Sequence, residues 1–253
     1  FTMDELDLLT TIAGQLAQAA QNARLHQQII GQQRLAAIGQ AVSSVAHCIK
    51  NTLNGLQGGA YIVEIGMRND DLGRVSKGWE MVRRNSDFMG DLVRDMLAFC
   101  RKQPPRREQV STAELLSETV EMVREQGASA GVEVILDLQE VDVLLIADSM
   151  GIKRLVLNLL SNAIDACPDG SHVWVRGGSG GGHGMYRIEV EDDGPGIPPD
   201  VQERLFEPFF STKGSRGTGL GLALVQKVAQ EHNGHVEVDS QEGVGTVFGV
   251  ELP

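Results

Sequence analysis

The order of hydrophobic and polar positions divides the chain into a helical first part and a mixed second part. Apolar residues recur every three or four positions through most of the first hundred residues, a spacing that favours a coiled coil or a bundle seam. The polar stretch 68–74 interrupts this spacing, which then resumes up to Cys100. The pattern predicts two long helices joined by a turn. Such a helical hairpin has too little core to stand alone, so we expect two copies to pair into a dimeric four-helix bundle.

The second part begins after a proline-containing linker at 102–108, because paired prolines end a helix. Strands and helices then alternate. Strands are expected at 132–138, 143–147, 172–177 and 185–192 and in two final segments, and helices at 112–125, 149–166 and 219–232. This order predicts an α+β sandwich in which helices cover one face of a mixed sheet. The glycine-rich run 177–182 is expected to be a hairpin connection.

Composition narrows the classes of partner. The net charge of −12 at pH 7 argues against nucleic acid, because phosphates demand a basic face. No stretch reaches the roughly 18 apolar residues of a membrane span, and we expect no signal peptide. Three widely separated cysteines are typical of reduced thiols in a cytosolic protein. We therefore expect a cytoplasmic segment without direct membrane insertion.

Two segments of the second part carry side chains suited to bind a nucleotide. In the predicted helix 149–166, Asn158 and Asn162 lie four residues apart and share one face, where their amide oxygens can coordinate Mg²⁺. The segment 191–198 runs from acidic residues into Gly-Pro-Gly, so Asp192 could accept a hydrogen bond from an adenine amino group. Two exposed asparagines and a plain turn are the alternative interpretations.

Two further segments are rich in glycine. Residues 204–226 contain glycines that precede and open an amphipathic helix, whose unpaired N–H groups would form a site for a polyphosphate. Lys213 and Arg216 add positive charge beside this site. The segment 242–248 forms a glycine turn with Thr246 near the pocket rim, although alone it is more often a simple hairpin.

Together, the motifs NxxxNAxDA, DDGPGI, FEPFFSTK, GTGLGL and GVGT resemble the ATPase domain of sensor histidine kinases. This domain has the GHKL (Bergerat) fold of gyrase, Hsp90 and MutL, and the likeness covers about residues 105–253. It implies ATP as substrate, Mg²⁺ as cofactor, two asparagines as metal ligands, and an aspartate that reads adenine. The nucleotide-binding residues expected from the motifs are Asn158, Asn162, Asp165, Asp192, Gly194, Gly196, Ile197, Phe206, Lys213, Arg216, Gly217, Thr218, Gly219, Leu220, Gly221, Leu222 and Thr246.

One of the six histidines is distinguished by its position. His47 lies in a predicted helix in which positions 42, 45 and 49 face the bundle interior, so its side chain is expected to face outward. An unperturbed imidazole has a pKa of about 6.5 and is largely neutral, hence nucleophilic, at pH 7. The surrounding AHCIKN resembles the phosphoacceptor motif of the histidine kinase dimerisation domain. The remaining histidines are expected at the solvated surface: His26, His172, His183, His232 and His235.

This second resemblance implies that a ring nitrogen of His47 attacks the γ-phosphoryl group of ATP, and that the group then passes to an aspartate of a response regulator receiver domain. Lys50 and Asn51 would complete the catalytic group. The family commonly carries Glu or Asp directly after the histidine, where this chain has Cys48, and a protonated thiol is a poor base. The alternative is therefore an ATP-binding dimeric signalling scaffold, or a phosphatase-biased kinase with weak autophosphorylation.

The resemblances divide the chain into three parts. Residues 1–32 resemble the last helix of a GAF-type sensory domain running into a signalling coiled coil. Residues 33–103 would form the dimerisation and histidine phosphotransfer domain, and residues 104–253 the ATP-binding catalytic domain. An ATP-driven clamp of the MutL or Hsp90 type is a third interpretation, which would need a transducer domain after the ATPase fold.

Overall fold

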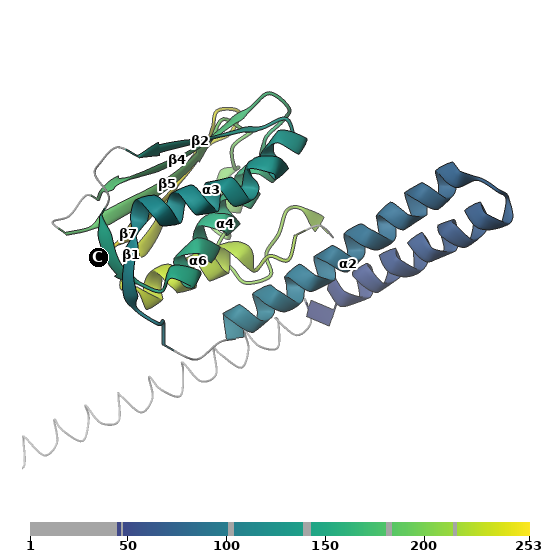
Figure 1. Ribbon diagram of the computed structural model, residues 1–253, viewed down its shortest axis with the longest axis horizontal. Coiled ribbons are helices and arrows are strands. Elements are labelled where there is room, and N and C mark those ends of the chain that lie inside the picture. Colours follow the sequence, from purple (N-terminus) through teal and green to yellow (C-terminus); the bar gives the residue numbers. More distant parts are fainter. Residues whose placement is uncertain (1–44, 47, 101–103, 139–142, 181–183, 215–216) are drawn as a thin grey trace, which may run out of the picture. The chain divides into compact units, whose positions relative to one another are not determined.

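The computed structural model describes residues 45–46, 48–100, 104–138, 143–180, 184–214 and 217–253 (Figure 1). His47, Arg216 and the predicted sensory helix at 1–32 lie outside these residues. The chain groups into two compact units, Phe1–Lys50 and Asn51–Pro253. Within the described part, no helix combines the length and the apolar character needed to cross a membrane.

The predicted helical hairpin is confirmed. Residues 51–68 are helical, and a turn leads into helix α2, Leu72–Cys100. The two helices approach closely because glycines face each other: a Cβ on Gly59 would lie 2.9 Å from the carbonyl oxygen of Gly78, and a Cβ on Gly78 would lie 2.7 Å from the carbonyl oxygen of Gly59. Any larger residue at either position would push the helices apart, so this pair sets their separation.

Part of the apolar seam expected in the second helix is exposed. Trp79 is 63% exposed, and Val93 and Met96 on the same heptad seam are exposed as well. Other large apolar side chains of the hairpin share this exposure, among them Leu53, Tyr61, Met67 and Leu97. The hairpin therefore presents apolar surface that the Asn51–Pro253 unit does not cover.

A mixed sheet of five strands in the order β2-β4-β5-β7-β6 forms the second part. β2 runs parallel to β4, and the other neighbouring strands pair antiparallel. The strand bounds are β2 Glu133–Leu138, β4 His172–Ser179, β5 Tyr186–Asp192, β6 His235–Gln241 and β7 Gly245–Leu252. A separate small sheet pairs β1, Glu108–Ser111, with β3, Leu144–Ala147. The expectation of an α+β sandwich is confirmed, but β1 was not predicted.

Strand β4 runs two residues beyond the expected end at 177, through Gly178 and Ser179, which corrects the expectation that these two belong to a hairpin connection. Gly177 and Gly178 pair with Ile188 and Arg187 as part of β4. A Cβ on Gly177 would collide with the hydroxyl of Tyr186. Glycine is therefore needed at position 177, because the side chain of Tyr186 on the neighbouring strand β5 occupies the space that a Cβ would take.

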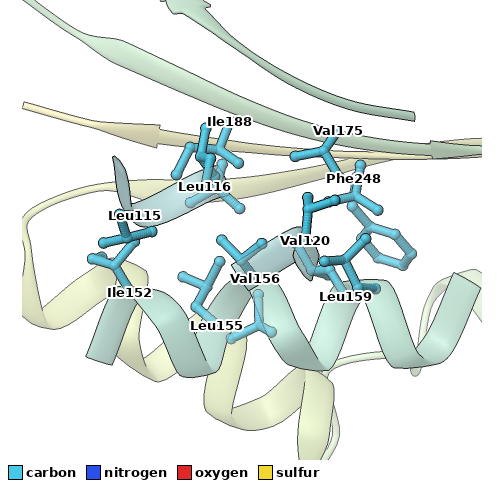
Figure 2. Packing of buried hydrophobic residues seen from close by; sticks show 14 of the residues in the cluster. Leu115, Leu116, Val120, Ile152, Leu155, Val156, Leu159, Val175, Ile188 and Phe248 are labelled. Atoms are coloured by element: carbon cyan, nitrogen blue, oxygen red, sulfur yellow. The ribbon is translucent and has the colours of Figure 1, made fainter. Parts of the chain in front are cut away.

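Three helices pack against one face of the large sheet (Figure 1). They are α3, Thr112–Ser129, α4, Ser149–Ala166, and α6, Gly221–Glu231, while the short α5, Pro199–Gln202, precedes the glycine-rich loop. Apolar side chains from two helices and the sheet interlock in the core, and burying each contributes about 1.5–3 kcal/mol. Figure 2 shows this layer with Leu116 and Val120 of α3, Leu155, Val156 and Leu159 of α4, and Val175, Ile188 and Phe248 of the sheet.

The expectation of a solvated His232 is wrong. His232 follows the last turn of α6 and is only 4% exposed. Its Nε2 accepts the backbone N–H of Asp148 at 2.9 Å, and its Nδ1 lies 2.8 Å from the carbonyl oxygen of Val228. Asp148 is also the N-cap of α4, where its Oδ1 accepts the N–H of Gly151. This histidine therefore joins the end of one helix to the start of another.

Candidate nucleotide-binding site

The four nucleotide-binding segments meet at one cavity of about 400 Å³, within the usual range for a small-molecule site. Helix α4, the C-terminal end of β5, the start of β7 and the loop before α6 contribute its walls. Of the residues expected from the motifs, the wall contains Asn158, Asn162, Asp165, Asp192, Ile197, Lys213, Gly217, Thr218, Gly219, Gly221, Leu222 and Thr246.

Asp192 is the buried acid of the cavity. It is 7% exposed, ends β5, and lies opposite Thr246 of β7 in the sheet register. Burial raises the pKa of its carboxyl, although the backbone N–H of Gly194, 3.0 Å from Oδ1, acts in the opposite direction. A desolvated carboxylate with one oxygen held by the backbone can accept a hydrogen bond from a ligand amino group.

The neighbouring Asp193 is bound elsewhere and does not line the cavity. Its Oδ1 accepts the backbone N–H of His172 at 2.8 Å, and its Oδ2 lies 3.0 Å from His172 Nδ1. Burial alone would raise the pKa of Asp193, but these bonds outweigh it and lower the pKa. The two consecutive acids therefore have separate tasks, with Asp193 anchoring the turn that orients Asp192.

Gly194 and Gly196 shape the turn behind the wall rather than line it. Gly196 has a φ of 70°, and a Cβ there would collide with the carbonyl oxygen of Gln241. A Cβ on Gly194 would lie 2.8 Å from Oδ1 of Asp192. The glycines let the turn fold tightly against the β6–β7 connection, which keeps the carboxylate in place.

Asn158 and Asn162 direct amide oxygens toward the glycine-rich loop. Asn158 Nδ2 donates to the carbonyl oxygen of Arg154 at 2.9 Å, and its Oδ1 lies 2.9 Å from where a Cβ on Gly221 would be. Asn162 Oδ1 accepts from Lys213 Nζ at 3.3 Å. Uncharged amide oxygens beside a helix N-terminus are of the type that could hold Mg²⁺ together with phosphate and water, and in this structure the Asn162 oxygen is bound by the Lys213 ammonium. Among the described residues no cluster of three His, Cys, Asp or Glu could hold a metal instead.

The loop before α6 is closed at its base by a backbone contact. Phe209 N–H donates to the carbonyl oxygen of Gly219 at 2.7 Å, and both residues have positive φ, 68° and 64°. A Cβ on Gly219 would lie 2.6 Å from the Cα of Phe209. Helix α6 then starts at Gly221 without a side-chain cap on its N-cap residue Leu220. Because Gly221 and Leu222 line the cavity, the uncapped N-terminus of this helix is suited to bind an anion there.

Two further predicted residues support the site from behind. Phe206 packs against the hydrophobic core, and Leu220 is fully buried. Neither lines the cavity, so their contribution is to hold the loop rather than to touch a ligand.

Helix α2 contributes three wall residues that the sequence did not reveal: Phe88, Asp91 and Asp95. Asp95 reaches Arg154 on α4 and Thr218 on the loop. Its position in a heptad-spaced helix far from the motifs gave no sign of this contact. Phe210, which belongs to the FEPFFSTK motif but was not among the expected nucleotide-binding residues, also lines the cavity and lies under the guanidinium of Arg204.

The region predicted to hold the phosphoacceptor is described on either side of His47 but not at His47 itself. Lys50 is exposed and Asn51 is half-buried, and both are helical. Cys48 is half-buried, and burial raises the pKa of its thiol. Cys48, directly after His47, is therefore a protonated thiol at neutral pH.

Comparisons with known proteins agree with this geometry. The family described as "Histidine kinase-, DNA gyrase B-, and HSP90-like ATPase" matches residues 147–253. The signal transduction histidine-protein kinase AtoS of Escherichia coli is 32% identical over 226 residues, which are 87% of this chain and 36% of AtoS. The chain spans about a third of the length of such curated relatives.

Two solved structures extend the comparison. The mycobacterial sensor histidine kinase MprB has 34% identity and a TM-score of 0.52, with 58% of this chain matching 97% of that one. Histidine kinase ThkA, solved in complex with response regulator protein TrrA, has 24% identity and a TM-score of 0.72, with 88% of this chain matching 63% of that one. The second likeness supports the fold of hairpin and catalytic part together. The match to MprB covers nearly the whole of the MprB chain at 34% identity. This chain therefore belongs to the sensor histidine kinase family of two-component signalling and contains the family's ATP-binding catalytic domain.

Proposed function

We propose that the chain uses Mg-ATP to phosphorylate His47 and then passes the phosphoryl group to an aspartate of a response regulator receiver domain. The observation that carries this proposal is the convergence of four separate segments on one cavity, whose wall contains both a buried acid, Asp192, and the N-terminus of helix α6. The similar fold of ThkA in its complex with TrrA supports a receiver domain as the partner.

In this proposal each end of the cavity binds one end of ATP. Asp192 accepts the adenine amino group, and Thr246 and Ile197 form the wall beside it. The first N–H groups of α6 bind the phosphates, with Lys213 and Arg216 adding positive charge. Asn158 and Asn162 would hold Mg²⁺, which would neutralise charge on the phosphate oxygens.

The chemical step is an in-line displacement at the γ-phosphorus. A ring nitrogen of neutral His47 donates its lone pair, an N–P bond forms, and the P–O bond to ADP breaks. The proton on the other ring nitrogen must leave to give neutral phosphohistidine. Cys48 is a poor acceptor for that proton because burial raises the pKa of its thiol, so another group or water accepts it. Lys50 and Asn51 complete the local set, and Asn51 would orient water when the partner is dephosphorylated.

The exposed seam of the hairpin supports a homodimer. Trp79, Val93 and Met96 are large apolar side chains at heptad positions that this unit leaves uncovered, and burying such a seam is what drives bundle formation. A second copy would cover them with the same seam. In this arrangement residues 33–103 form the dimerisation domain, residues 104–253 the catalytic domain, and residues 1–32 carry the signal from a GAF-type sensory domain.

The test is phosphorylation of the purified protein with γ-labelled ATP and Mg²⁺. We expect acid-labile, alkali-stable label that is absent from His47→Gln and kept by His235→Gln, a matched change at an exposed histidine. Asn162→Ala should lose label together with nucleotide binding. Wild-type protein that binds ATP but takes no label would favour the alternative function, an ATP-binding signalling scaffold or a phosphatase-biased kinase, for which Cys48 is the supporting residue.

A further inference from the structure

The hydroxyl of Ser240, in strand β6, contacts three groups next to the wall of the nucleotide cavity. Its Oγ accepts the backbone N–H of Ile197 at 2.8 Å and donates to the carbonyl oxygen of Gly245 at 3.0 Å. The third group is Oγ1 of Thr246, which lies 2.9 Å away. Ile197 and Thr246 line the cavity, whereas Ser240 does not. Ser240 therefore acts on the cavity through two of its wall residues.

The single hydrogen of the Ser240 hydroxyl fixes the direction of its bond with Thr246. A serine hydroxyl can donate once and accept through two lone pairs. The carbonyl oxygen of Gly245 can only accept, so it takes the one hydrogen of Ser240. The contact with Thr246 is then a bond in which the threonine donates. With its hydrogen held by Ser240, the Thr246 oxygen can only accept a further bond.

Thr246 stands beside Asp192, the buried acid of the cavity. The two residues are direct partners in the β5–β7 register, and side chains at such positions lie on one face of a sheet with Cβ atoms about 4.5–5.5 Å apart. Both line the cavity and both are buried. An ionised carboxylate can only accept hydrogen bonds. Two neighbouring groups of the wall are therefore acceptors, and a ligand that contacts both must offer hydrogens.

Gln202, the last residue of α5, holds Ser240 through its backbone. Its Nε2 donates to the carbonyl oxygen of Ile197 at 2.6 Å and to that of Ser240 at 2.9 Å. These bonds tie the turn at Ile197 to strand β6. They do not involve the Ser240 hydroxyl, so a change at Gln202 loosens this connection without altering which groups donate and which accept.

We propose that Ser240 is a positioning residue for base specificity, which holds the Thr246 hydroxyl as an acceptor so that the cavity selects a 6-aminopurine over a 6-oxopurine. The amino group of adenine has two hydrogens, enough for one bond to Asp192 and one to Thr246. A 6-oxopurine has an oxygen at this position, which both acceptors repel. This inference rests on the proposed ATP site and adds the residue that sets its hydrogen-bond polarity.

The experiment compares ATP with inosine triphosphate (ITP), which carries a 6-oxopurine on the same ribose triphosphate. Both compete with a fluorescent adenine nucleotide for the full chain in the presence of Mg²⁺, and effects at the phosphates cancel in the ratio of the two affinities. Ser240→Ala frees the Thr246 hydroxyl to donate, so we expect the preference for ATP over ITP to fall about five- to tenfold, the contribution of one hydrogen bond. Ser240→Thr keeps a hydroxyl and should keep the preference.

Two further variants separate hydrogen-bond polarity from a general loosening of the site. Thr246→Val removes the acceptor and should lower the preference by a similar factor. Adding Ser240→Ala to it should cause no further fall, because the serine acts through this threonine. Gln202→Met breaks the backbone connection instead, so it should weaken ATP and ITP binding alike and leave their ratio unchanged.

A wild-type ratio of affinities in Ser240→Ala would overturn this inference while leaving ATP binding in place. An equal further fall on adding Ser240→Ala to Thr246→Val would overturn it too, since the serine would then act by another route. If Ser240→Ala does not fold, Thr246→Val decides, and an unchanged preference there would contradict the inference. Wild-type protein that binds no ATP would contradict the proposed function itself.

Discussion

Asp95 of helix α2 accepts the hydroxyl hydrogen of Thr218 at 3.1 Å, which connects the hairpin to the loop at the nucleotide cavity. Its other oxygen accepts from Arg154 Nη2 of α4 at 2.9 Å, and the side chain is only 17% exposed. Thr218 Oγ1 in turn accepts the backbone N–H of Leu220 at 3.3 Å. One carboxylate thus joins α4 to the loop before α6 and brings negative charge to the cavity wall.

Removing this carboxylate should increase the affinity for ATP. Asp95→Ala releases Thr218 and takes away a charge that repels a polyphosphate, so we expect a gain of about two- to fivefold, corresponding to roughly 0.5–1 kcal/mol for a partly exposed charge. Isothermal titration calorimetry at low salt gives the affinity. Asp87→Ala makes the same charge change on α2 outside the cavity wall and should have no effect. An equal gain in ATP affinity in both variants would show that the change in net charge, and not the loss of the Asp95–Thr218 contact, is the cause.

Asp192→Asn should abolish tight adenine nucleotide binding while leaving the fold intact. The carboxylate is the form that accepts an amino hydrogen, and burial raises its pKa. As pH falls through this raised pKa, the acid becomes protonated, and ATP affinity should decline at a pH above that at which an ordinary aspartate titrates, about 3.9. Affinity measured across mildly acidic pH tests this decline.

The same raised pKa has the opposite consequence for stability. A carboxyl whose folded-state pKa is raised stabilises the fold below its unfolded-state pKa, and this stabilisation is lost as pH rises through the folded-state pKa. Asp192→Asn should therefore melt no lower than the wild type at neutral pH without nucleotide. A clear fall in melting temperature would mean that the charge itself is needed for folding.

His232→Ala should destabilise the catalytic part by about 1–3 kcal/mol, the usual cost of leaving a buried hydrogen-bonding group unsatisfied. The affected group is the N–H of Asp148, which His232 Nε2 accepts. Urea unfolding gives the change. His235→Ala is the control, because His235 is exposed on β6, and its effect should stay within about 0.5 kcal/mol. Equal stabilities for the two variants would contradict a structural role for His232.

Cys48→Glu should accelerate autophosphorylation on the order of 10²-fold, the lower range for a positioned general base. The physical reason is that burial raises the pKa of the native thiol, which leaves it protonated, whereas a carboxylate can take the imidazole proton. Initial rates of acid-labile labelling provide the measurement, and Cys48→Ser supplies a neutral control of similar size. No gain with Glu would indicate that an acceptor outside position 48 already serves His47.

Gly78→Ala should destabilise the hairpin by about 1–3 kcal/mol, because overpacking forces the backbones apart. Gly90→Ala is a matched change in the same helix, where the nearest atom to a Cβ is 3.6 Å away on the flexible side chain of Arg94. It should be neutral or stabilise by up to about 1 kcal/mol, since alanine favours helix. Thermal melting followed by far-UV circular dichroism compares the two, and a fall of similar size in both would show that the close contact at Gly78 is not the cause.

The sequence predicted helix α4 and the cavity residues well because their signals are local. An N-capping aspartate and apolar spacing define α4, and the motif glycines are needed at turns where the backbone is crowded. Asp95 and His232 escaped prediction because their roles depend on partners 123 and 84 residues away. Gly178 and Ser179 were assigned to a hairpin connection because the strand that pairs with them, at Arg187 and Tyr186, lies elsewhere in the chain.

The contact between Gly59 and Gly78 also determines how the hairpin can move. At this contact the two main chains lie so close that sliding or rotating one helix against the other would bring its backbone into collision with the carbonyl oxygen of the opposing glycine. The separation of the two helices is therefore fixed at this point by their main chains. Because Asp95 of α2 also bonds Thr218, a residue that widens the hairpin at Gly59 or Gly78 would disturb the helix that supports the loop before α6.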